Sequence, residues 1–496
     1  MQGIAYWIEK KAQIQPDSIA IITENEQLTY DQFNQQIKKL ASYLHNHLDV
    51  SKGERIAILS QNRVEYLTLL FAIAQLEAIA VPLNIRLTIN ELHFQLQDSG
   101  ATILFCENEF EQTAALLKEE TAIRQIIKME TVGDLDCVSK PDFSSVNESA
   151  SYIICYTSGT TGQPKGAVLT QSNMFWNAIN NTLALDLTSS DRSIVLLPFF
   201  HIGGIGLFAL PTLFVGGTVI IPGKFDVEKA LFMIEKYEST IVMGVPTIHQ
   251  ALLQSSTFQT RNLQSVRWFY NGGAPCPHEI IQAFIQAGFL FGQGFGMTET
   301  SPTLFMLSKH DARRKIGSIG KPVAFCDYKL ITSSGEEAGS GEVGEILVRG
   351  PNVMKEYWKR PDATKETFID GWLKTGDLAR VDEEGFLYIV GRKKDMIISG
   401  GENIYPLEIE QVLNQLDEVK EAVVVGKSDH KWGEVPVAYV VKKENTALSE
   451  QAIRNHCATS LAKFKIPKEI YFLNELPKNA TGKVQKNRLT MNEEMI

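Results

Sequence analysis

The sequence has little cysteine, and what it has is scattered. Its six cysteines form no Cys-x-x-Cys pair; they are Cys106, Cys137, Cys155, Cys276, Cys326 and Cys457. This spacing provides neither a disulfide framework nor a zinc site, and it favours a reducing compartment.

Long apolar runs and an excess of positive charge are also missing. The most apolar window, Leu67 to Leu83, is interrupted by Gln75 and Glu77, whereas a membrane span needs about 20 apolar residues. The first residues carry charges where a secretory signal needs an apolar stretch. The net charge of −10 argues against nucleic acid as a partner. We therefore predict a cytoplasmic protein in which residues 67–83 form a buried helix that runs into a strand.

The chain is too long for one hydrophobic core, and its apolar pattern changes along its length. Residues 33–48 follow a helical period, behind a capping box of Thr29 and Gln32. Strands of the parallel type alternate with helices, at 55–60, 101–106, 193–197 and 240–244. From about residue 325, short strands are separated by Gly, Glu and Asp turns, as in a small antiparallel barrel. The last hundred residues mix strands with a helix near 450–461.

The predicted fold class is α/β, with a large N-terminal domain of mixed, mostly parallel sheets and a small C-terminal α+β domain. The N-terminal domain spans residues 1–391, of which about 325–391 form the β-barrel subdomain, and the C-terminal domain spans 392–496. The boundary falls at Gly391–Lys394, beside a dense cluster of charges.

The strongest chemical signal is the segment Tyr156–Gly166, which follows the apolar strand 152–156. Glycines let successive backbone N–H groups approach an anion, hydroxyls add donors, and Lys165 adds a positive charge. The residues concerned are Thr157, Ser158, Gly159, Thr160, Thr161 and Gly162. The pattern predicts a phosphate cradle, although a plain surface loop has a similar composition. It is not a Walker A loop, because no Gly-Lys-Ser/Thr triplet opens a helix.

Four further segments are weaker when taken alone. In Phe291–Thr300, glycines flank Phe295, an aromatic suited to stacking on a flat ring, and Glu299 beside Thr298 offers oxygen ligands to Mg²⁺. In Trp372–Leu378, Asp377 after a glycine turn suits sugar hydroxyls. Gly391–Pro406 joins cations to a Gly-Gly loop, and Pro477–Lys483 ends in a lysine. Each also fits an ordinary solvated turn.

Together, in this order and at these separations, the segments resemble the acyl-adenylate-forming superfamily, and most of all its fatty acyl- and aryl-CoA synthetases. The likeness runs from Leu28–Tyr30 to Lys483. It implies an ATP-dependent, AMP-forming carboxylate–CoA ligase that uses Mg²⁺, ATP and coenzyme A. Acyl-AMP and pyrophosphate form first, and acyl-CoA and AMP follow. It also implies that residues 392–496 act as a mobile lid, which presents different groups to the two steps.

The resemblance implies a role for each matching residue. The Thr157–Lys165 loop would hold the ATP phosphates, and Asp377, with Arg392, the ribose. Residues around adenine would be Gly272, Gly273, Ala274, Gln293, Gly294, Phe295 and Gly296. Catalytic roles would fall to Lys483 at the α-phosphate, Glu299 on Mg²⁺, Thr298, His201 beside the acyl group and Lys394 at the hinge. Lys224, Gly400 and Gly401 would line the CoA site.

Several questions stay open on the sequence alone. Ile398 occupies a position where plant coumarate ligases and luciferases carry a lysine, so that lysine's role in thioester formation does not carry over. A stand-alone enzyme that loads a carrier protein is an alternative, although no carrier segment is evident. A catalytically inert nucleotide sensor is disfavoured because Lys483, Glu299 and Asp377 are all present. Fatty acids and aryl acids, including o-succinylbenzoate, remain open as substrates: a small residue such as Gly206 or Gly244 would admit a chain. A homodimer is compatible with the sequence.

Overall fold

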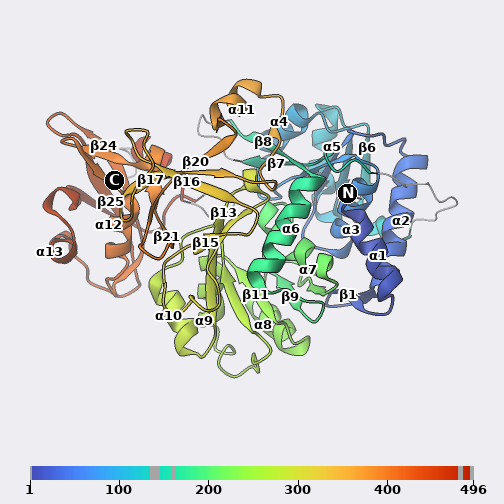
Figure 1. Cartoon of the computed structure of the whole chain (residues 1–496), viewed down its shortest axis with the longest axis horizontal. Coiled ribbons are helices and arrows are strands. Elements are labelled where there is room, and N and C mark those ends of the chain that lie inside the picture. The colour runs from blue at the N-terminus through green and yellow to red at the C-terminus, as the bar shows by residue number, and fades with distance from the viewer. Residues whose placement is uncertain (1–2, 135–145, 158–162, 479–483, 492–496) are drawn as a thin grey trace. The chain divides into compact units, whose positions relative to one another are not determined.

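The computed structural model describes residues 3–134, 146–157, 163–478 and 484–491 (Figure 1). The chain folds into two compact units. Unit 1 joins Met1–Asp327 to Val348–Leu373, and unit 2 joins Tyr328–Leu347 to Lys374–Ile496. The predicted α/β class, with a large N-terminal part and a smaller C-terminal part, is confirmed. The boundary at Gly391–Lys394 stays a prediction.

Unit 1 contains a seven-stranded sheet with the order β18-β8-β7-β4-β3-β5-β6. Five neighbouring strands are parallel; at one edge, β8 pairs antiparallel with β7, and β18 pairs antiparallel with β8. The strands are β3 (Arg55–Leu59), β4 (Ile79–Pro82), β5 (Ile103–Cys106), β6 (Gln125–Lys128), β7 (Ser151–Thr157), β8 (Lys165–Thr170) and β18 (Glu356–Tyr357). Four of the parallel strands, β3, β4, β5 and β7, are buried along most of their length, which is why they read as continuous apolar runs.

The second sheet of unit 1 has nine strands in the order β15-β14-β13-β12-β11-β9-β10-β1-β2. Its central strands, from β13 to β1, are all parallel. The strands are β1 (Ile19–Ile22), β2 (Gln27–Thr29), β9 (Arg192–Val195), β10 (Thr218–Ile220), β11 (Ile241–Gly244), β12 (Trp268–Asn271), β13 (Phe291–Gly296), β14 (Thr303–Met306) and β15 (Lys321–Pro322).

Helices of unit 1 begin where the sequence offers caps. Helix α2 starts at the predicted capping box, in which the Thr29 hydroxyl accepts a hydrogen bond from the Gln32 N–H, and it buries Phe33, Ile37 and Leu40. Helices α1, α2 and α3 pack on one another, as do α6 and α7 (Figure 1). The helices are α1 (Ala5–Ile14), α2 (Tyr30–Asn46), α3 (Val64–Gln75), α4 (Ile89–Ser99), α5 (Glu111–Glu119), α6 (Gln171–Leu185), α7 (Leu210–Val215), α8 (Val227–Lys236), α9 (Pro246–Gln254), α10 (His278–Gln286) and α11 (Pro361–Thr367).

The most apolar window is a buried helix followed by a strand, as predicted. Helix α3 is buried along almost its whole length and leads into β4. Across the described ranges, every helix is too short or too polar to cross a bilayer.

The C-terminal part of the chain mixes strands and helices as predicted. A five-stranded sheet has the order β16-β17-β20-β19, with β21 beside β20, and a second has the order β23-β22-β25-β24, with β26 beside β25. The strands are β16 (Asp327–Ile331), β17 (Val343–Arg349), β19 (Phe368–Ile369), β20 (Trp372–Val381), β21 (Leu387–Arg392), β22 (Ile397–Ser399), β23 (Glu402–Ile404), β24 (Val419–Asp429), β25 (Gly433–Lys442) and β26 (Glu469–Leu473). Helices are α12 (Pro406–Leu413), α13 (Glu450–Ser460) and α14 (Lys486–Met491).

Candidate active site

The parallel strands of the nine-stranded sheet gather most of the predicted site residues of unit 1 at one edge. The chain leaves β9, β10, β12 and β13 at their carboxyl ends and then passes through His201, Lys224, Gly272–Ala274 and Thr298–Glu299 respectively. In addition, β10 and β11 lie on opposite sides of β9, so the strand order reverses there. Open α/β sheets bind ligands beyond the carboxyl ends of their strands at such a reversal.

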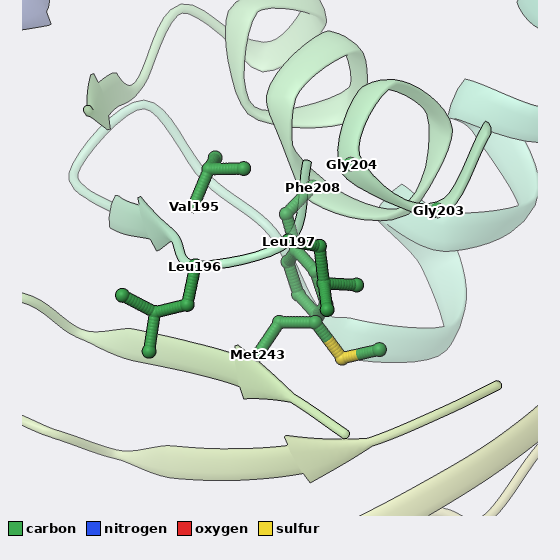
Figure 2. Close-up of a pocket in the computed structure, with 7 residues that line it drawn as sticks. All are labelled: Val195, Leu196, Leu197, Gly203, Gly204, Phe208 and Met243. Atoms are coloured by element: carbon green, nitrogen blue, oxygen red, sulfur yellow. The ribbon is translucent and has the colours of Figure 1, made fainter. Parts of the chain in front are cut away.

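A narrow apolar gap lies at this reversal, between β9, β11 and the helical segment η3 (Gly204–Ala209) (Figure 2). It is too narrow to hold a water molecule. Its lining residues are Val195, Leu196, Leu197, Gly203, Gly204, Phe208 and Met243. The segment η3 is π-helical, a conformation that is frequent at functional sites. His201 lies in the loop that leads into it.

A buried asparagine joins this loop to the seven-stranded sheet. Asn62 follows β3; its Nδ2 donates to the Leu197 carbonyl at 2.8 Å, and its Oδ1 accepts from the Phe199 N–H at 2.7 Å. The loop that carries His201 is therefore anchored from the carboxyl edge of the neighbouring sheet. The sequence did not reveal Asn62, because its partners lie about 135 residues away.

The predicted phosphate loop connects two strands that pair as an antiparallel hairpin, β7 and β8. Thr157 ends β7 and pairs with Lys165, which begins β8, and the Thr157 hydroxyl donates to the Lys165 carbonyl at 3.4 Å. A loop between antiparallel strands agrees with the prediction that it is not a Walker A loop, since that motif opens a helix. The predicted residues Ser158, Gly159, Thr160, Thr161 and Gly162 lie outside the described ranges.

A tyrosine side chain, Tyr357, contacts both Lys165 of this hairpin and Glu299. Glu299 belongs to the short helix η4 (Thr298–Thr300) and is 6% exposed. The Tyr357 hydroxyl donates to its Oε1 at 2.7 Å, and the Lys165 ammonium lies 5.4 Å from the centroid of the Tyr357 ring. Burial, reinforced by the charge of Glu299, raises the pKa of Tyr357, so the phenol stays a donor. No motif in the sequence marked Tyr357.

The glycines of the 291–300 segment have a packing role that the sequence did not indicate. A Cβ on Gly296 would lie 1.7 Å from the Pro302 carbonyl oxygen, and one on Gly294 would lie 2.8 Å from that of Phe305. These glycines therefore let β13 pair closely with β14. Phe295 is half-buried between them, with its ring centroid 6.2 Å from that of Phe305. The neighbouring Gln293 is buried, and its side-chain amide donates to the Ser318 carbonyl at 2.8 Å.

The segment after β12 is held in a turn. Gly273 has φ +83°, a left-handed conformation that favours glycine, and the Asn271 side-chain amide donates to the Ala274 carbonyl at 2.9 Å. Gly273 and Ala274 are exposed, whereas a Cβ on Gly272 would lie 2.8 Å from the Met243 methyl group. Lys224 is exposed in the loop after β10.

Two cysteines lie close in sequence to the predicted site residues. Burial first, and then the charge of Glu299, raise the pKa of Cys155 on β7 to about 12. Burial, with the charge of Glu279, also raises the pKa of Cys276, near Ala274, to about 12. Both thiols stay protonated at neutral pH, and a protonated thiol is a poor nucleophile.

In unit 2, Asp377 and Arg392 face each other on β20 and β21. Asp377 pairs with Arg392 in the strand register, and the Arg392 Nε lies 3.1 Å from the Asp377 Oδ1. The prediction that Asp377 lies in a turn is wrong: it lies within β20 and is 5% exposed. The preceding Gly376 has φ +74°, so the glycine distorts the strand without ending it.

The remaining predicted residues of unit 2 lie in the segment that follows β21. Lys394 is exposed on the short helix η5 (Lys393–Asp395). Gly400 and Gly401, both with positive φ, form the two-residue turn between β22 and β23. The Gly400 N–H donates to the Trp432 carbonyl at 2.7 Å, and a Cβ on Gly400 would lie 2.9 Å from the Trp432 ring. Ile398, on β22, is exposed. Lys483 lies outside the described residues.

Comparison with known proteins identifies the class that this fold and site define. Residues 8–358 match the model of the AMP-binding enzyme family, and residues 408–483 match its C-terminal domain. The chain belongs to this family. The predicted membership of the acyl-adenylate-forming enzymes and the predicted class, an AMP-forming acid–thiol ligase, are confirmed.

Particular relatives are similar over nearly their whole length. The chain is 40% identical to a feruloyl-CoA synthase of Amycolatopsis sp, and the alignment covers 98% of each chain. It is 38% identical to a 2-succinylbenzoate–CoA ligase of Bacillus cytotoxicus, covering 99% of this chain and 98% of the relative. The solved structure of o-succinylbenzoate CoA synthetase from Bacillus subtilis, in complex with its acyl-adenylate intermediate, aligns with a TM-score of 0.91 at 37% identity and covers 99% of both chains.

The Asp377–Arg392 pair leads to a prediction on nucleotide binding. Asp377→Asn keeps the size of the side chain but removes the charge that would accept two ribose hydroxyls. Hydrogen bonds to a charged group contribute about 1.5–3 kcal/mol, so the Kd for ATP should rise about ten- to a hundredfold. Equilibrium binding of ATP measures this. Because Asp377 is buried and paired with Arg392, thermal unfolding should be recorded beside it. An unchanged Kd would remove Asp377 from the nucleotide site.

Proposed function

We propose that this ligase activates an aryl acid with ATP and transfers the aryl acyl group to coenzyme A. The names of the relatives support an aromatic acid, since feruloyl and succinylbenzoate groups both carry a ring. The observation that carries the proposal is the close packing around Gly206 and Gly244, because it limits how deep the acid-binding site can be.

Gly206 and Gly244, the small residues predicted to admit an alkyl chain, are closely packed against neighbouring atoms. A Cβ on Gly206 would lie 2.5 Å from the Ser301 carbonyl oxygen and 2.7 Å from the Pro302 ring. A Cβ on Gly244 would lie 3.0 Å from both His249 and Ile248. These glycines therefore bring backbone and side chains together, which supports a shallow acid site over a deep channel. A flat ring fits between closely packed surfaces, whereas a long alkyl chain needs a deep tunnel.

A single buried carboxylate fits Mg²⁺ at the nucleotide. Among the described residues, no three His, Cys, Asp or Glu side chains gather into a metal cage. Mg²⁺ is commonly held by one or two protein carboxylates together with substrate phosphates, and Glu299, with the adjacent Thr298 hydroxyl, supplies oxygen donors of that kind. Bound there, the ion would neutralise charge on the phosphates during adenylation.

The other residues take the roles that the resemblance gives them. Thr157 and Lys165, with Ser158–Gly162, hold the phosphates. Gly272–Ala274 and Gln293–Gly296 surround adenine, and Asp377 with Arg392 holds the ribose. His201 lies beside the acid. Lys483 stabilises the α-phosphate, Lys394 is the hinge of a lid domain that begins at residue 392, and Lys224, Gly400 and Gly401 line the CoA site.

These groups account for a two-step reaction. A carboxylate is a poor electrophile, so its oxygen attacks the α-phosphate and pyrophosphate leaves. Cations stabilise the developing negative charge, each contributing about 3 kcal/mol to lowering the barrier. The CoA thiolate then attacks the acyl carbonyl and releases AMP. A cytoplasmic location and a homodimer remain predictions.

An acid panel tests this proposal. Pyrophosphate release and thioester formation are measured with cinnamates, arylalkanoates, a keto-acid-substituted benzoate, and fatty acids of medium and long chain. Each acid is tested with free CoA, with a carrier protein in its place, and with neither. We expect kcat/KM for the best aryl acid to exceed that for the fatty acids at least about tenfold, the size of discrimination that a hydrophobic pocket achieves, and we expect thioester on free CoA. A preference for long-chain acids would contradict the aryl proposal. Thioester formed only on a carrier protein would favour the alternative enzyme that loads carriers, and ADP as the product would contradict adenylation.

A further inference from the structure

Tyr357 lies between the hairpin of β7 and β8, which carries Thr157 and Lys165, and the short helix η4, which carries Glu299. Its strand, β18, pairs with β8, the return strand of the hairpin, with Tyr357 opposite Ala167. The backbone confirms the position, since the Trp358 N–H donates to the Gly166 carbonyl at 2.7 Å. On the other side, the Met354 N–H donates to the Glu299 carbonyl at 2.7 Å. Residues 354–358 therefore fix the hairpin and Glu299 to each other.

The side chain of Tyr357 contacts both functional groups with different parts. Its hydroxyl donates to Glu299 Oε1 at 2.7 Å, with both residues buried, and the face of its ring lies 5.4 Å from the Lys165 ammonium. A phenol that donates to one oxygen fixes the plane of the carboxylate. An ammonium over an aromatic face is attracted by the ring without being neutralised.

The two groups that Tyr357 contacts carry opposite charges. The Lys165 ammonium lies over the ring, and the Glu299 carboxylate accepts from the hydroxyl at the other end of the side chain. A direct ion pair would use the carboxylate needed by the metal and the ammonium needed by the phosphates. Because the tyrosine side chain is neutral, its contact with the Lys165 ammonium does not neutralise that charge.

We propose that Tyr357 is a positioning residue, which orients Glu299 for Mg²⁺ through its hydroxyl and keeps Lys165 available for the ATP phosphates through its ring. This inference rests on the proposed function only in taking Glu299 as the metal ligand and Lys165 as a phosphate ligand. It does not depend on which acid is activated.

Two variants separate the hydroxyl from the ring. Tyr357→Phe keeps the ring, and Tyr357→Leu removes both. Binding of Mn²⁺ to the enzyme–ATP complex is followed by electron paramagnetic resonance, and binding of ATP without metal by equilibrium dialysis. We expect Tyr357→Phe to weaken Mn²⁺ binding about tenfold and to leave metal-free ATP binding near that of the wild type. Tyr357→Leu should weaken both, because Lys165 and Glu299 can then pair.

Kinetics distinguish a positioning role from a merely structural one. For Tyr357→Phe, the Mg²⁺ concentration at half-maximal adenylation should rise about tenfold, while the KM for the acid stays unchanged. Thioester formation from synthetic acyl-adenylate and CoA should also be unchanged. Two tyrosines provide controls: Tyr471→Phe removes a phenol that donates to Glu469 in β26, and Tyr152→Phe removes a buried phenol that donates to the Leu70 carbonyl. Neither should alter Mn²⁺ binding.

Several outcomes would overturn the proposal. The proposal is wrong if Tyr357→Phe binds Mn²⁺ as tightly as the wild type does. Normal Mn²⁺ binding in Glu299→Gln would also overturn it, since Tyr357 acts through that carboxylate. An equal loss of metal binding, acid binding and thermal stability in both variants would reduce Tyr357 to a structural residue. The binding assay contains neither acid nor CoA, so failure of the aryl-CoA ligase function appears separately, in the acid panel with Mn²⁺ binding intact.

Discussion

Glu299→Gln should lower the rate of acyl-adenylate formation by about 10²–10³, the loss seen when a group that stabilises transition-state charge is removed. The substitution keeps the shape of the side chain and an oxygen that accepts from the Tyr357 hydroxyl, which lies 2.7 Å from Oε1. Only the negative charge is lost. Mg²⁺ binds a carboxylate much more strongly than an amide oxygen, so the nucleotide would lose its metal while the surrounding structure is preserved.

Single-turnover release of pyrophosphate, measured over a range of Mg²⁺ concentrations, tests this expectation. Thermal unfolding of the variant should stay close to that of the wild type. Glu54→Gln is a matched control, because Glu54 is also mostly buried and hydrogen-bonded, to Thr102 and Arg124. That control should retain adenylation. A Glu299→Gln enzyme with wild-type adenylation at low Mg²⁺ would exclude Glu299 as the metal ligand.

The secondary structure was predictable where burial is periodic in the sequence. Helix α2 begins at the predicted cap and buries the predicted apolar stripe, and the window 67–83 is the predicted helix followed by a strand. The apolar strand predicted at 152–156, ahead of the phosphate segment, is present as β7. In each case the signal lies in consecutive residues, so no knowledge of distant partners is needed.

The arrangement of the site was only partly predictable. Residues that follow parallel strands share one edge of a sheet, but the strand order that puts β9 between β10 and β11 is not encoded in any local pattern. The position of Asp377 was missed because a Gly-Asp pair usually marks a turn, whereas here pairing with β21 continues the strand. Tyr357 and Asn62 escaped notice for a similar reason. Their partners, Glu299 and Leu197, lie 58 and 135 residues away.

The glycines show how one composition supports two interpretations. Glycines around Phe295 suggested a backbone surface for a flat ring. The structure gives Gly294 and Gly296 a different physical cause, since a side chain on either would collide with the backbone of the 302–305 segment. The sequence shows where the chain has glycine, but only the fold shows which neighbouring atoms leave no room for a side chain there.

Substitution of Lys483 should slow adenylation and spare thioester formation. Lys483 lies outside the described residues, and its role rests on the resemblance, which places it at the α-phosphate only during adenylation. Its ammonium would stabilise charge in the first transition state and contribute little to the second. Lys483→Ala should therefore lose about 10²–10³ in pyrophosphate release. Given synthetic acyl-adenylate and CoA, the same variant should form thioester at a near-normal rate.

Two further variants make this comparison decisive. Lys478→Ala, from the same C-terminal segment, is the control: its ammonium pairs with Glu421 at 2.8 Å, and we expect both half-reactions to be retained. Lys394→Pro should show the opposite bias to Lys483→Ala, because a proline within η5 fixes φ at the proposed hinge and hinders the change of pose needed for thioester formation. Single-turnover assays of each half-reaction provide the measurement. If Lys483→Ala slows both steps equally, the lysine does not act in one pose alone, and a lid that presents different groups to the two steps is the wrong mechanism for this enzyme.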